Sequence, residues 1–402
     1  MAAWISKTLG EVTSFITKGI PPKYTEKESK NTIRVLNQKC NRNFEISYDE
    51  SRLHDVRLKK VPENKYLQPG DVLINSTGTG TAGRVAQIFD VPVPTTIDGH
   101  MILIRPTKEI DFLYYGYAVK GNQKVIETLA EGSTGQTEVN RQRLQDEIVI
   151  NFPKDKELQK EIGTLLFLID EKIRNNNQIN NNLEQQAQAL FKAWFLDYEP
   201  WDGSVPDSWN SGKLGDFAEI KRGGSPRPIQ EYLSDSGLLW LKISDVTNLQ
   251  TPFVIDIKDH IIEAGLRKTV FLKAGSLVLS NSATPGVPKI LDVDSCIHDG
   301  WLYFPESKFS KEYLYLYFKY IRQQLVNLSN GSVFNNLKTD ILKGYPTILP
   351  DKETLRRFDD IVMPIFLQIR NLTRESHKLA DMRDALLPKL MSGELVISDI
   401  KL

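Results

Sequence analysis

The sequence is poor in the residues that build metal centres and disulfide frameworks. Its 402 residues include only two cysteines, Cys40 and Cys296, and five histidines. The cysteines lie far apart in the chain, so we expect neither a metal motif nor a disulfide, and a reducing cytoplasmic setting is the simplest interpretation. The histidines, which show no metal-ligand spacing, are His54, His100, His260, His298 and His377.

Long hydrophobic runs are also missing. No stretch of about 18 apolar residues occurs, so no membrane span is expected. The first residues, MAAWISKTLGEV, lack a basic start followed by an apolar stretch and do not form a secretory signal. Hydrophobic residues make up 40% and charged residues 25%, which is typical of a globular protein, and the length suits two or three domains.

The formal net charge is zero. This argues against a protein that is basic all over, but not against DNA binding, because phosphate contacts need only local clusters of lysine and arginine. The stretch 23–60 is rich in basic residues, although a mixed solvated face is the favoured interpretation of that stretch alone. Its basic residues are Lys23, Lys27, Lys30, Arg34, Lys39, Arg42, Arg52, Arg57, Lys59 and Lys60.

Catalytic signatures are lacking. The sequence has no Walker loop, no G-x-S-x-G elbow and no Asn/Asp-Pro-Pro-Tyr/Phe tetrapeptide of the adenine methyltransferase kind. The run from Gly78 to Gly83 fits G-x-G-x-x-G, and Asp98 follows about twenty residues later. A dinucleotide site needs a helix at the third glycine, whereas residues 84–89 read as extended chain before two prolines. We therefore expect no dinucleotide site.

What the chain does have is an internal repeat. Each half begins with a Leu-Gly-acidic segment, continues to a basic-glycine turn, and later has an Asp-Gly before an apolar run. The simplest interpretation of each Asp-Gly is a turn. The paired segments are Leu9 to Val12 with Leu214 to Phe217, Lys18-Gly19 with Arg222-Gly223, Leu67 to Ile74 with Leu272 to Leu279, Asp98-Gly99 with Asp299-Gly300, and Gly132-Ser133 with Gly331-Ser332.

After a strand-like stretch each half becomes helical. Apolar residues alternate at spacings of four and three, which is a heptad seam. The first helix is predicted from about Glu157 to Leu196, roughly 60 Å long. The seam positions are Ile162, Leu166, Ile169, Ile173, Asn176, Asn180, Leu183, Ala187, Leu190 and Trp194 in the first half, and Phe358, Val362, Ile365, Ile369, Leu372, Ser376, Leu379, Arg383, Leu386 and Leu390 in the second.

Seams at matched phase suggest that the two helices pack on each other, and an antiparallel pair would place the globular parts at opposite ends. Pro364 should kink the second helix or delay its start, and Pro388 should end or bend it. The Asn-rich segment 175–182 is either a linker or a continuation of the seam, and the second is favoured because the seam stays in register on both sides. Buried Asn176 and Asn180 would then fix the register at some cost in stability.

The globular halves read mostly as short strands, at 72–74, 101–104, 277–279 and 302–304, with helices at 112–130 and 311–328. The predicted fold class is therefore α/β (α+β): two mixed α/β domains separated by two long antiparallel helices that form a coiled coil. The predicted boundaries are 1–153 and 201–350 for the globular domains, and 154–200 and 351–402 for the helical regions.

The best functional candidates are polar, glycine-rich loops that recur at equivalent points of both halves. Their side chains can bond to base edges, arginine pairs with guanine, and glycine lets backbone approach phosphate. For any single residue an ordinary loop role is the favoured interpretation, but recurrence favours DNA binding for the set. The predicted DNA-binding residues are Thr77, Thr79, Arg84, Ser133, Thr134, Gln136, Arg141 and Arg143 in the first half, and Arg222, Arg227, Lys242, Asn281, Thr284, Asn335, Asn336 and Lys338 in the second.

The order of these segments, present twice, resembles the specificity subunits of Type I restriction-modification systems over essentially the whole chain. The segments that carry the resemblance are Leu9-Gly10-Glu11 with Leu214-Gly215-Asp216, Pro69 to Ser76, Gly132 to Gln136, Leu239 to Val246, Ile173 to Asn177, Ala189-Leu190-Phe191-Lys192-Ala193-Trp194-Phe195 and Arg383 to Leu395. One departure is that the second half has Ser332-Val333-Phe334-Asn335 where the first has Ser-Thr-Gly-Gln. This leaves the contacting residues there open.

The resemblance implies two target-recognition domains, each reading one half of a split double-stranded DNA site, with the helical regions as spacers. It also implies that two modification subunits bind this chain and bring S-adenosylmethionine, and that restriction subunits add ATP- and Mg-dependent translocation and cleavage. This chain would bind no cofactor and would be non-catalytic. Helix or subunit contacts are expected at Ile169, Ile173, Leu183, Leu190, Trp194, Ile365, Ile369, Leu379, Leu386 and Leu390.

Two rival functions stay open. One is an enzyme acting alone as a nuclease or methyltransferase, and the other is a coiled-coil adaptor without DNA specificity. Because the loops of the two halves diverge more than their framework, we expect an asymmetric site rather than a palindrome.

Overall fold

The computed structural model of the chain describes residues 3–132, 137–329 and 336–397. These residues form two compact units. Unit 1 comprises Met1–Glu171 together with Leu379–Leu402, and unit 2 comprises Lys172–Lys378. Each unit thus contains one half of the repeat and a segment of each of the two long helices.

The described part of unit 1 is built on two four-stranded sheets. One has the order β2 (Thr13–Lys18), β11 (Met101–Pro106), β8 (Val72–Asn75), β9 (Val85–Gln87). The other has the order β10 (Thr95–Ile97), β4 (Thr32–Leu36), β7 (Arg52–Asp55), β3 (Tyr24–Thr25). Two-stranded pairs are β1 (Trp4–Thr8) with β14 (Val149–Pro153), β5 (Asn41–Arg42) with β6 (Glu45–Ile46), and β12 (Ala130–Glu131) with β13 (Glu138–Val139). The short helices are η1 (Gln38–Cys40), η2 (Glu63–Lys65), α1 (Phe112–Gly121), α2 (Gln123–Thr128) and α3 (Arg141–Glu147).

Strands β8 and β11 lie at the centre of unit 1 and are buried on both faces. Val72 and Ile74 face a core that includes Tyr114 and Tyr117 of α1, whereas Leu73 faces a second core formed with the other sheet. Burial on both faces explains why these strands read as continuous apolar runs rather than as alternating ones.

The described part of unit 2 repeats this plan with two five-stranded sheets. One has the order β16 (Lys221–Arg222), β25 (Trp301–Tyr303), β22 (Leu277–Ser280), β23 (Pro288–Leu291), β19 (Phe253–Val254). The other has the order β17 (Leu233–Ser234), β20 (His260–Ile261), β18 (Leu238–Leu241), β24 (Ser295–Ile297), β21 (Val270–Leu272). A further pair joins β15 (Asn210–Lys213) to β26 (Pro346–Leu349). The short helices are η3 (Glu199–Trp201), α5 (Leu214–Phe217), η4 (Ile229–Glu231), α6 (Ile243–Val246), η5 (Glu263–Lys268), α7 (Lys311–Ser329) and α8 (Thr339–Lys343).

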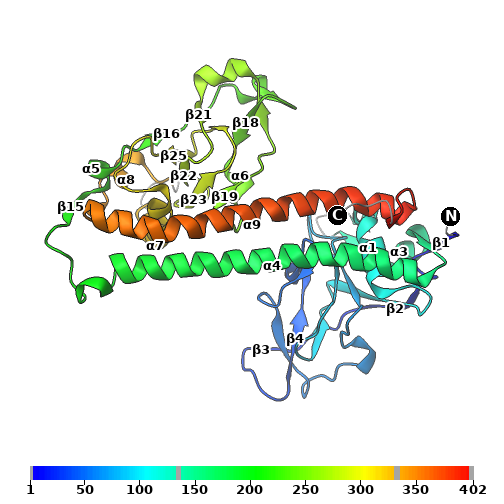
Figure 1. The fold of residues 1–402 in the computed structure, drawn as a ribbon. Helices are drawn as coiled ribbons and strands as arrows, with labels where there is room; N and C mark the ends of the chain where they lie inside the picture. Colours follow the sequence, from blue (N-terminus) through cyan, green and yellow to red (C-terminus); the bar gives the residue numbers. More distant parts are fainter. Residues whose placement is uncertain (1–2, 133–136, 330–335, 398–402) are drawn as a thin grey trace. The chain divides into compact units, whose positions relative to one another are not determined.

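The long helices α4 (Lys156–Phe195) and α9 (Lys352–Ser392) confirm the predicted heptad seams. None of the predicted seam positions is exposed; each is buried or half-buried. In unit 2, Asn176 donates to Glu375 and Asn180 to Thr373, so the partner number falls as the α4 number rises. Within each unit the segments of α4 and α9 therefore lie side by side and run in opposite directions (Figure 1). The Asn-rich segment is helix and not a linker.

Of the expected proline effects, a delayed start at Pro364 and an end at Pro388 do not occur. Helix α9 begins at Lys352, before Pro364, and continues through Pro388 to Ser392. Both prolines are exposed, so the carbonyl that each one leaves without its helical partner can be hydrated. Packing of neighbours such as Phe366, which is 1% exposed, holds the helix on its inner side.

Candidate functional site

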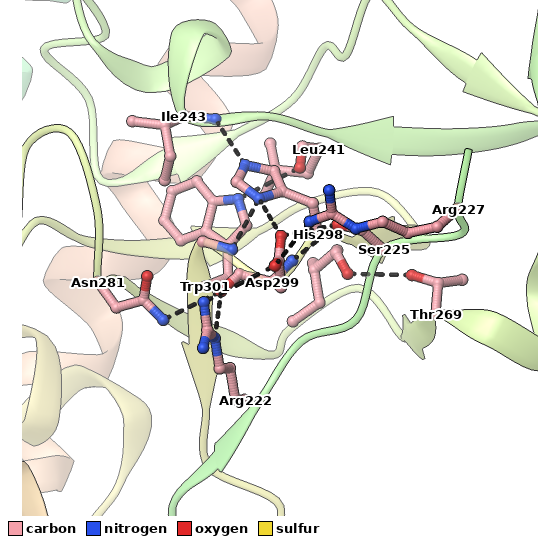
Figure 2. Close-up of polar contacts among 12 residues, drawn as sticks. Arg222, Ser225, Arg227, Leu241, Ile243, Thr269, Asn281, His298, Asp299 and Trp301 are labelled. Carbon is pink, nitrogen blue, oxygen red and sulfur yellow. Dashed lines mark hydrogen bonds and ion pairs between the residues drawn. The ribbon is translucent and has the colours of Figure 1, made fainter. Parts of the chain in front are cut away.

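In unit 2 the predicted polar loops converge on Asp299, in the turn between β24 and β25. Ser225 donates a hydrogen bond of 2.8 Å to Asp299 Oδ1. Arg227 Nη2 lies 3.3 Å from Asp299 Oδ2, and Arg222 Nε donates to the Asp299 carbonyl at 2.5 Å. Asn281 Nδ2 donates to the same carbonyl at 3.2 Å. Figure 2 shows these groups gathered around Asp299 from two segments of the chain, 222–227 and the loop after β22.

The cluster presents positive charge to solvent. The side chains of Arg222 and Arg227 are 53% and 78% exposed, and that of Asp299 is 38% exposed. Burial opposes ionisation of Asp299, but the Ser225 hydrogen bond and the nearby positive charges hold its pKa below the ordinary value. At neutral pH the carboxylate is therefore ionised, and two guanidinium groups share one negative charge.

His298 contributes an uncharged, packed ring to this cluster. Its ring lies between those of Trp240 and Trp301, with centroids 6.1 and 6.4 Å away. Burial lowers the pKa of His298 although the neighbouring Asp299 carboxylate opposes this shift, so the ring is neutral at neutral pH. Backbone amides face both nitrogens of the ring: the Gly300 amide lies 2.7 Å from Nδ1 and the Ile243 amide lies 3.3 Å from Nε2.

A second feature borders the loop after β22. Thr284 lines a cavity of about 220 Å³ together with Lys289, Lys319 and Arg322. Its hydroxyl is buried without a hydrogen-bond partner, whereas Lys289 donates to the carbonyl oxygens of residues 249 and 251. Thr284 and Asn281 thus connect the cavity with the Asp299 cluster through one loop.

The other predicted residues of unit 2 are placed less centrally. Lys242 Nζ pairs with Asp259 at 2.5 Å, although its charge reaches His298. Lys338 is exposed at the start of α8, and Asn336 is half-buried. Asn335 lies outside the described residues. The structure thus brings Arg222, Arg227 and Asn281 together, and leaves Lys338 at a separate exposed position.

In unit 1 the equivalent aspartate, Asp98, has different surroundings. It is 5% exposed and accepts from the His100 amide at 2.9 Å. Burial raises the pKa of Asp98, although the hydroxyl of Tyr24 and the charge of Arg52 act against this rise. The Arg52 guanidinium lies 3.5 Å from the ring centroid of Tyr24 and covers its face.

The predicted loop between β8 and β9 lies next to this turn. The Thr77 hydroxyl is 2.9 Å from His100 Nδ1, and Thr79 is exposed at the loop tip. Arg84 Nη2 donates to the Gly80 carbonyl at 3.0 Å. Gly78, Gly80 and Gly83 all have positive φ, so these glycines shape a turn, and the expectation that no helix follows is confirmed.

The remaining basic candidates of unit 1 differ from one another. Arg143 is held by Glu131 and Glu147, which occupies its guanidinium. Arg141 is exposed and lines an open cavity of about 590 Å³ with Asn140 and other polar residues. The predicted residues Ser133, Thr134 and Gln136 lie outside the described residues. Arg141 is therefore the better placed of the two arginines for contact with a ligand.

The sequence interpretation missed several members of these clusters. Asp98 and Asp299 were interpreted as turn residues, which they are, but each is also the centre of a polar network. Their recurrence at matched positions was the signal available. Nothing in the sequence marked Ser225 or Tyr24, because strand pairing alone brings them to the turn.

Within residues 3–132, 137–329 and 336–397 no group of three or more His, Cys, Asp and Glu side chains could hold a metal ion. In the same part of the chain no helix is both long and apolar enough to cross a membrane.

Comparison with known proteins gives concordant matches. A family model described as Type I restriction modification DNA specificity domain matches residues 1–185 and 206–376. The chain is 25% identical over 384 residues to the Type I restriction enzyme MjaIX specificity subunit of Methanocaldococcus jannaschii, covering 89% of this chain and 85% of that one. It is 24% identical over 471 residues to the HindI specificity subunit of Haemophilus influenzae, covering 98% and 100%. The crystal structure of a Type I restriction-modification S subunit from M. genitalium shares the fold, with a TM-score of 0.62 at 16% identity over 97% of this chain and 96% of that one.

Proposed function

The chain belongs to the family of Type I restriction modification DNA specificity domains, and on this premise we propose that it directs such a complex to a bipartite, asymmetric duplex site. Each unit reads one half of the site. The observation that supports this most is the Asp-Gly turn at Asp98 and at Asp299, which gathers arginine and polar loop residues in both units. Arginine at such loops is suited to phosphate and to guanine.

The asymmetry follows from the different loops that surround one framework. In unit 2 the turn is lined by Arg222 and Arg227, and in unit 1 by Tyr24 and Arg52. Different donors at equivalent positions favour different base pairs. We therefore expect the two half-sites to differ in sequence.

In this proposal the chain is non-catalytic and works in a complex in the cytoplasm. Two modification subunits bind it and bring S-adenosylmethionine for adenine methylation, and restriction subunits bring ATP- and Mg-dependent translocation and cleavage. The long helices α4 and α9 space the two recognition units and offer their outer faces to the partners.

The test is the methylation pattern of cells that carry this chain with its modification subunits. We expect one bipartite motif with two different halves. Substituting both Arg222 and Arg227 by alanine should relax the motif in one half and leave the other unchanged. The matched control is Arg356→Ala, since Arg356 is also an exposed arginine of unit 2 but pairs with Glu353 and Asp360 on α9.

Three outcomes would contradict the proposal. Absence of any sequence-specific duplex binding by the reconstituted complex would favour the coiled-coil adaptor. S-adenosylmethionine binding or DNA cleavage by the purified chain alone would favour an independent enzyme. Equal relaxation of both halves by the unit 2 variant would remove the assignment of one unit to one half. Binding must be measured across salt concentrations, because phosphate attraction alone is independent of sequence.

The spacing role has its own test. One heptad inserted after Glu171 in α4 and another after Lys378 in α9 keep the seam in phase. At about 1.5 Å per helical residue and about 3.4 Å per base pair, the gap between half-sites should lengthen by about three base pairs. An unchanged gap in the methylated motif would rule out this ruler mechanism.

A further inference from the structure

Asp299 holds two exposed arginines in a place where the chain does not need them for stability. The loops of the cluster are already joined through their backbones: Gly223 N donates to Trp301 O at 2.8 Å, and Asn281 N donates to Gly300 O at 2.8 Å. The backbone of Gly223 also packs directly against the Asp299 turn, since a Cβ there would lie 2.3 Å from the His298 carbonyl oxygen. The pairs between arginine and carboxylate therefore add little to the joining of the loops.

These contacts use only part of each guanidinium. Arg227 contacts Asp299 Oδ2 through Nη2 alone. Arg222 contacts the carbonyl through Nε, and its Nη2 lies 3.7 Å from Oδ2. A guanidinium has five N–H donors in a planar fork, so each arginine keeps donors that face solvent. This fits their exposure of 53% and 78%.

Resting on the proposed function, we propose that Asp299 is a positioning residue that braces Arg222 and Arg227, so that their free N–H edges read guanine in one half-site. Guanine presents two acceptors that match an arginine fork. Bracing removes side-chain freedom before binding, so less entropy is lost when the base contact forms. The carboxylate also cancels one positive charge and thereby weakens sequence-independent attraction to phosphates. Asp299 thus favours selectivity over total affinity.

The comparison with unit 1 supports a dedicated role for the carboxylate in unit 2. At the equivalent turn Asp98 is 5% exposed, and Arg52 lies over the face of Tyr24. The turn itself therefore does not require an aspartate that reaches solvent, as the half-buried Asp299 does. The aspartate reaches solvent only in the unit where two arginines lie beside it.

The test compares Asp299→Asn with the wild-type chain in the reconstituted complex. Asparagine keeps the shape and removes the charge. Equilibrium binding is measured on the cognate duplex and on a duplex with the unit 2 half-site scrambled, from low to high salt. We expect the ratio of the two affinities to fall about tenfold or more, mainly because the scrambled duplex binds more tightly, and the salt slope to steepen by up to about one phosphate contact.

Two further variants separate bracing from a folding effect. Asp299→Glu restores the charge and should recover part of the lost ratio. Ser225→Ala removes the 2.8 Å hydrogen bond to Oδ1 but leaves every charge in place, so the ratio should fall less and the salt slope should not change. In a chain that lacks Arg222 and Arg227, Asp299→Asn should no longer lower the ratio.

An affinity ratio within twofold of wild type in Asp299→Asn would overturn the inference. An equal loss of both affinities together with a lower melting temperature, not recovered by glutamate, would also overturn it and assign Asp299 a purely structural role. If the wild-type complex binds the cognate and the scrambled duplex equally well, the proposed function itself is overturned, which is a different result.

Discussion

Asp98 and Asp299 occupy the same turn of the repeated framework, yet the first is buried and the second is half-buried. The turn is fixed in both units by a glycine that directly follows a strand, Gly19 after β2 or Gly223 after β16, whose missing Cβ lets the backbones approach. What differs is the segment that follows that glycine. In unit 1 it brings Tyr24 to the aspartate, and in unit 2 it brings Ser225 and arginine. One framework can therefore carry two recognition surfaces.

The helix seam shows a second contrast between the units. In unit 1 the polar group at the seam is charged: Asp170 accepts from Tyr117 at 2.7 Å, pairs with Arg383 and lies 3.7 Å from Lys120. In unit 2 the seam carries the amides of Asn176 and Asn180, whose Oδ1 atoms are buried without a hydrogen-bond partner. The seam of unit 1 thus holds an ion pair, whereas the seam of unit 2 holds neutral amides.

The largest effect is expected from breaking the charged cluster of unit 1. Asp170→Leu removes the carboxylate that pairs with Arg383 and lies near Lys120, and it leaves Arg383 only its pair with the exposed Asp384. The loss should be about 3–5 kcal/mol. The double variant with Arg383→Leu should recover most of this loss, because it removes both members of the pair. Amide hydrogen exchange, measured separately for peptides of α1 and of α7, should show the loss in α1 alone. Equal protection in the single and double variants would contradict the argument.

The next effect tests whether the two turns are equivalent. A Cβ at Gly19 would lie 2.0 Å from the Asp98 carbonyl oxygen, and one at Gly223 would lie 2.3 Å from the His298 carbonyl oxygen. Backbone atoms cannot move aside cheaply, so Gly19→Ala and Gly223→Ala should each cost about 2–3 kcal/mol in urea unfolding. Gly99→Ala is the control, since nothing lies within 4 Å of its added Cβ. A loss in only one unit would show that the turns are not held in the same way.

These turns also show how far sequence reasoning reaches. The basic-glycine turn, the Asp-Gly turn, the central strands and both long helices follow from patterns that local chemistry imposes, such as the seam from Ile162 to Trp194. The network around Asp299 could not be predicted, because it depends on which side chains strand pairing brings to one turn. The same holds for Lys289, whose burial depends on carbonyl oxygens 38 and 40 residues away.

A pH experiment compares one buried lysine in each unit. Burial lowers the pKa of Lys120 in unit 1 and of Lys289 in unit 2 to about 8. Above this value the folded chain has lost a proton that the unfolded chain keeps up to about pH 10.4. Stability should therefore rise with pH, by about 1–2 kcal/mol per lysine between pH 8 and 9.5.

The measurement is urea unfolding at several pH values within that window, with each variant compared with wild type at the same pH, because tyrosines of the unfolded chain begin to ionise near its upper end. Lys120→Met and Lys289→Met should each make the rise of unfolding free energy with pH less steep. Hydrogen exchange should show the change in unit 1 for Lys120→Met and in unit 2 for Lys289→Met. The exposed Lys352 of α9 is the control position. If neither methionine variant changes the slope relative to wild type between pH 8 and 9.5, both lysines are charged in the folded chain.

The smallest effect concerns the amides of unit 2. Asn180 is 7% exposed, and its single hydrogen bond, to Thr373, is 3.2 Å long. Thr373 also donates to the Ile369 carbonyl, so Asn180→Leu leaves no buried donor unpaired there. Replacing a half-satisfied buried amide by leucine at a seam position should raise stability by about 1 kcal/mol. Asn177→Leu, at an exposed position of the same helix, should change it little. A lower melting temperature in Asn180→Leu would mean that this amide, although half-satisfied, contributes more to the seam of unit 2 than leucine packing can replace.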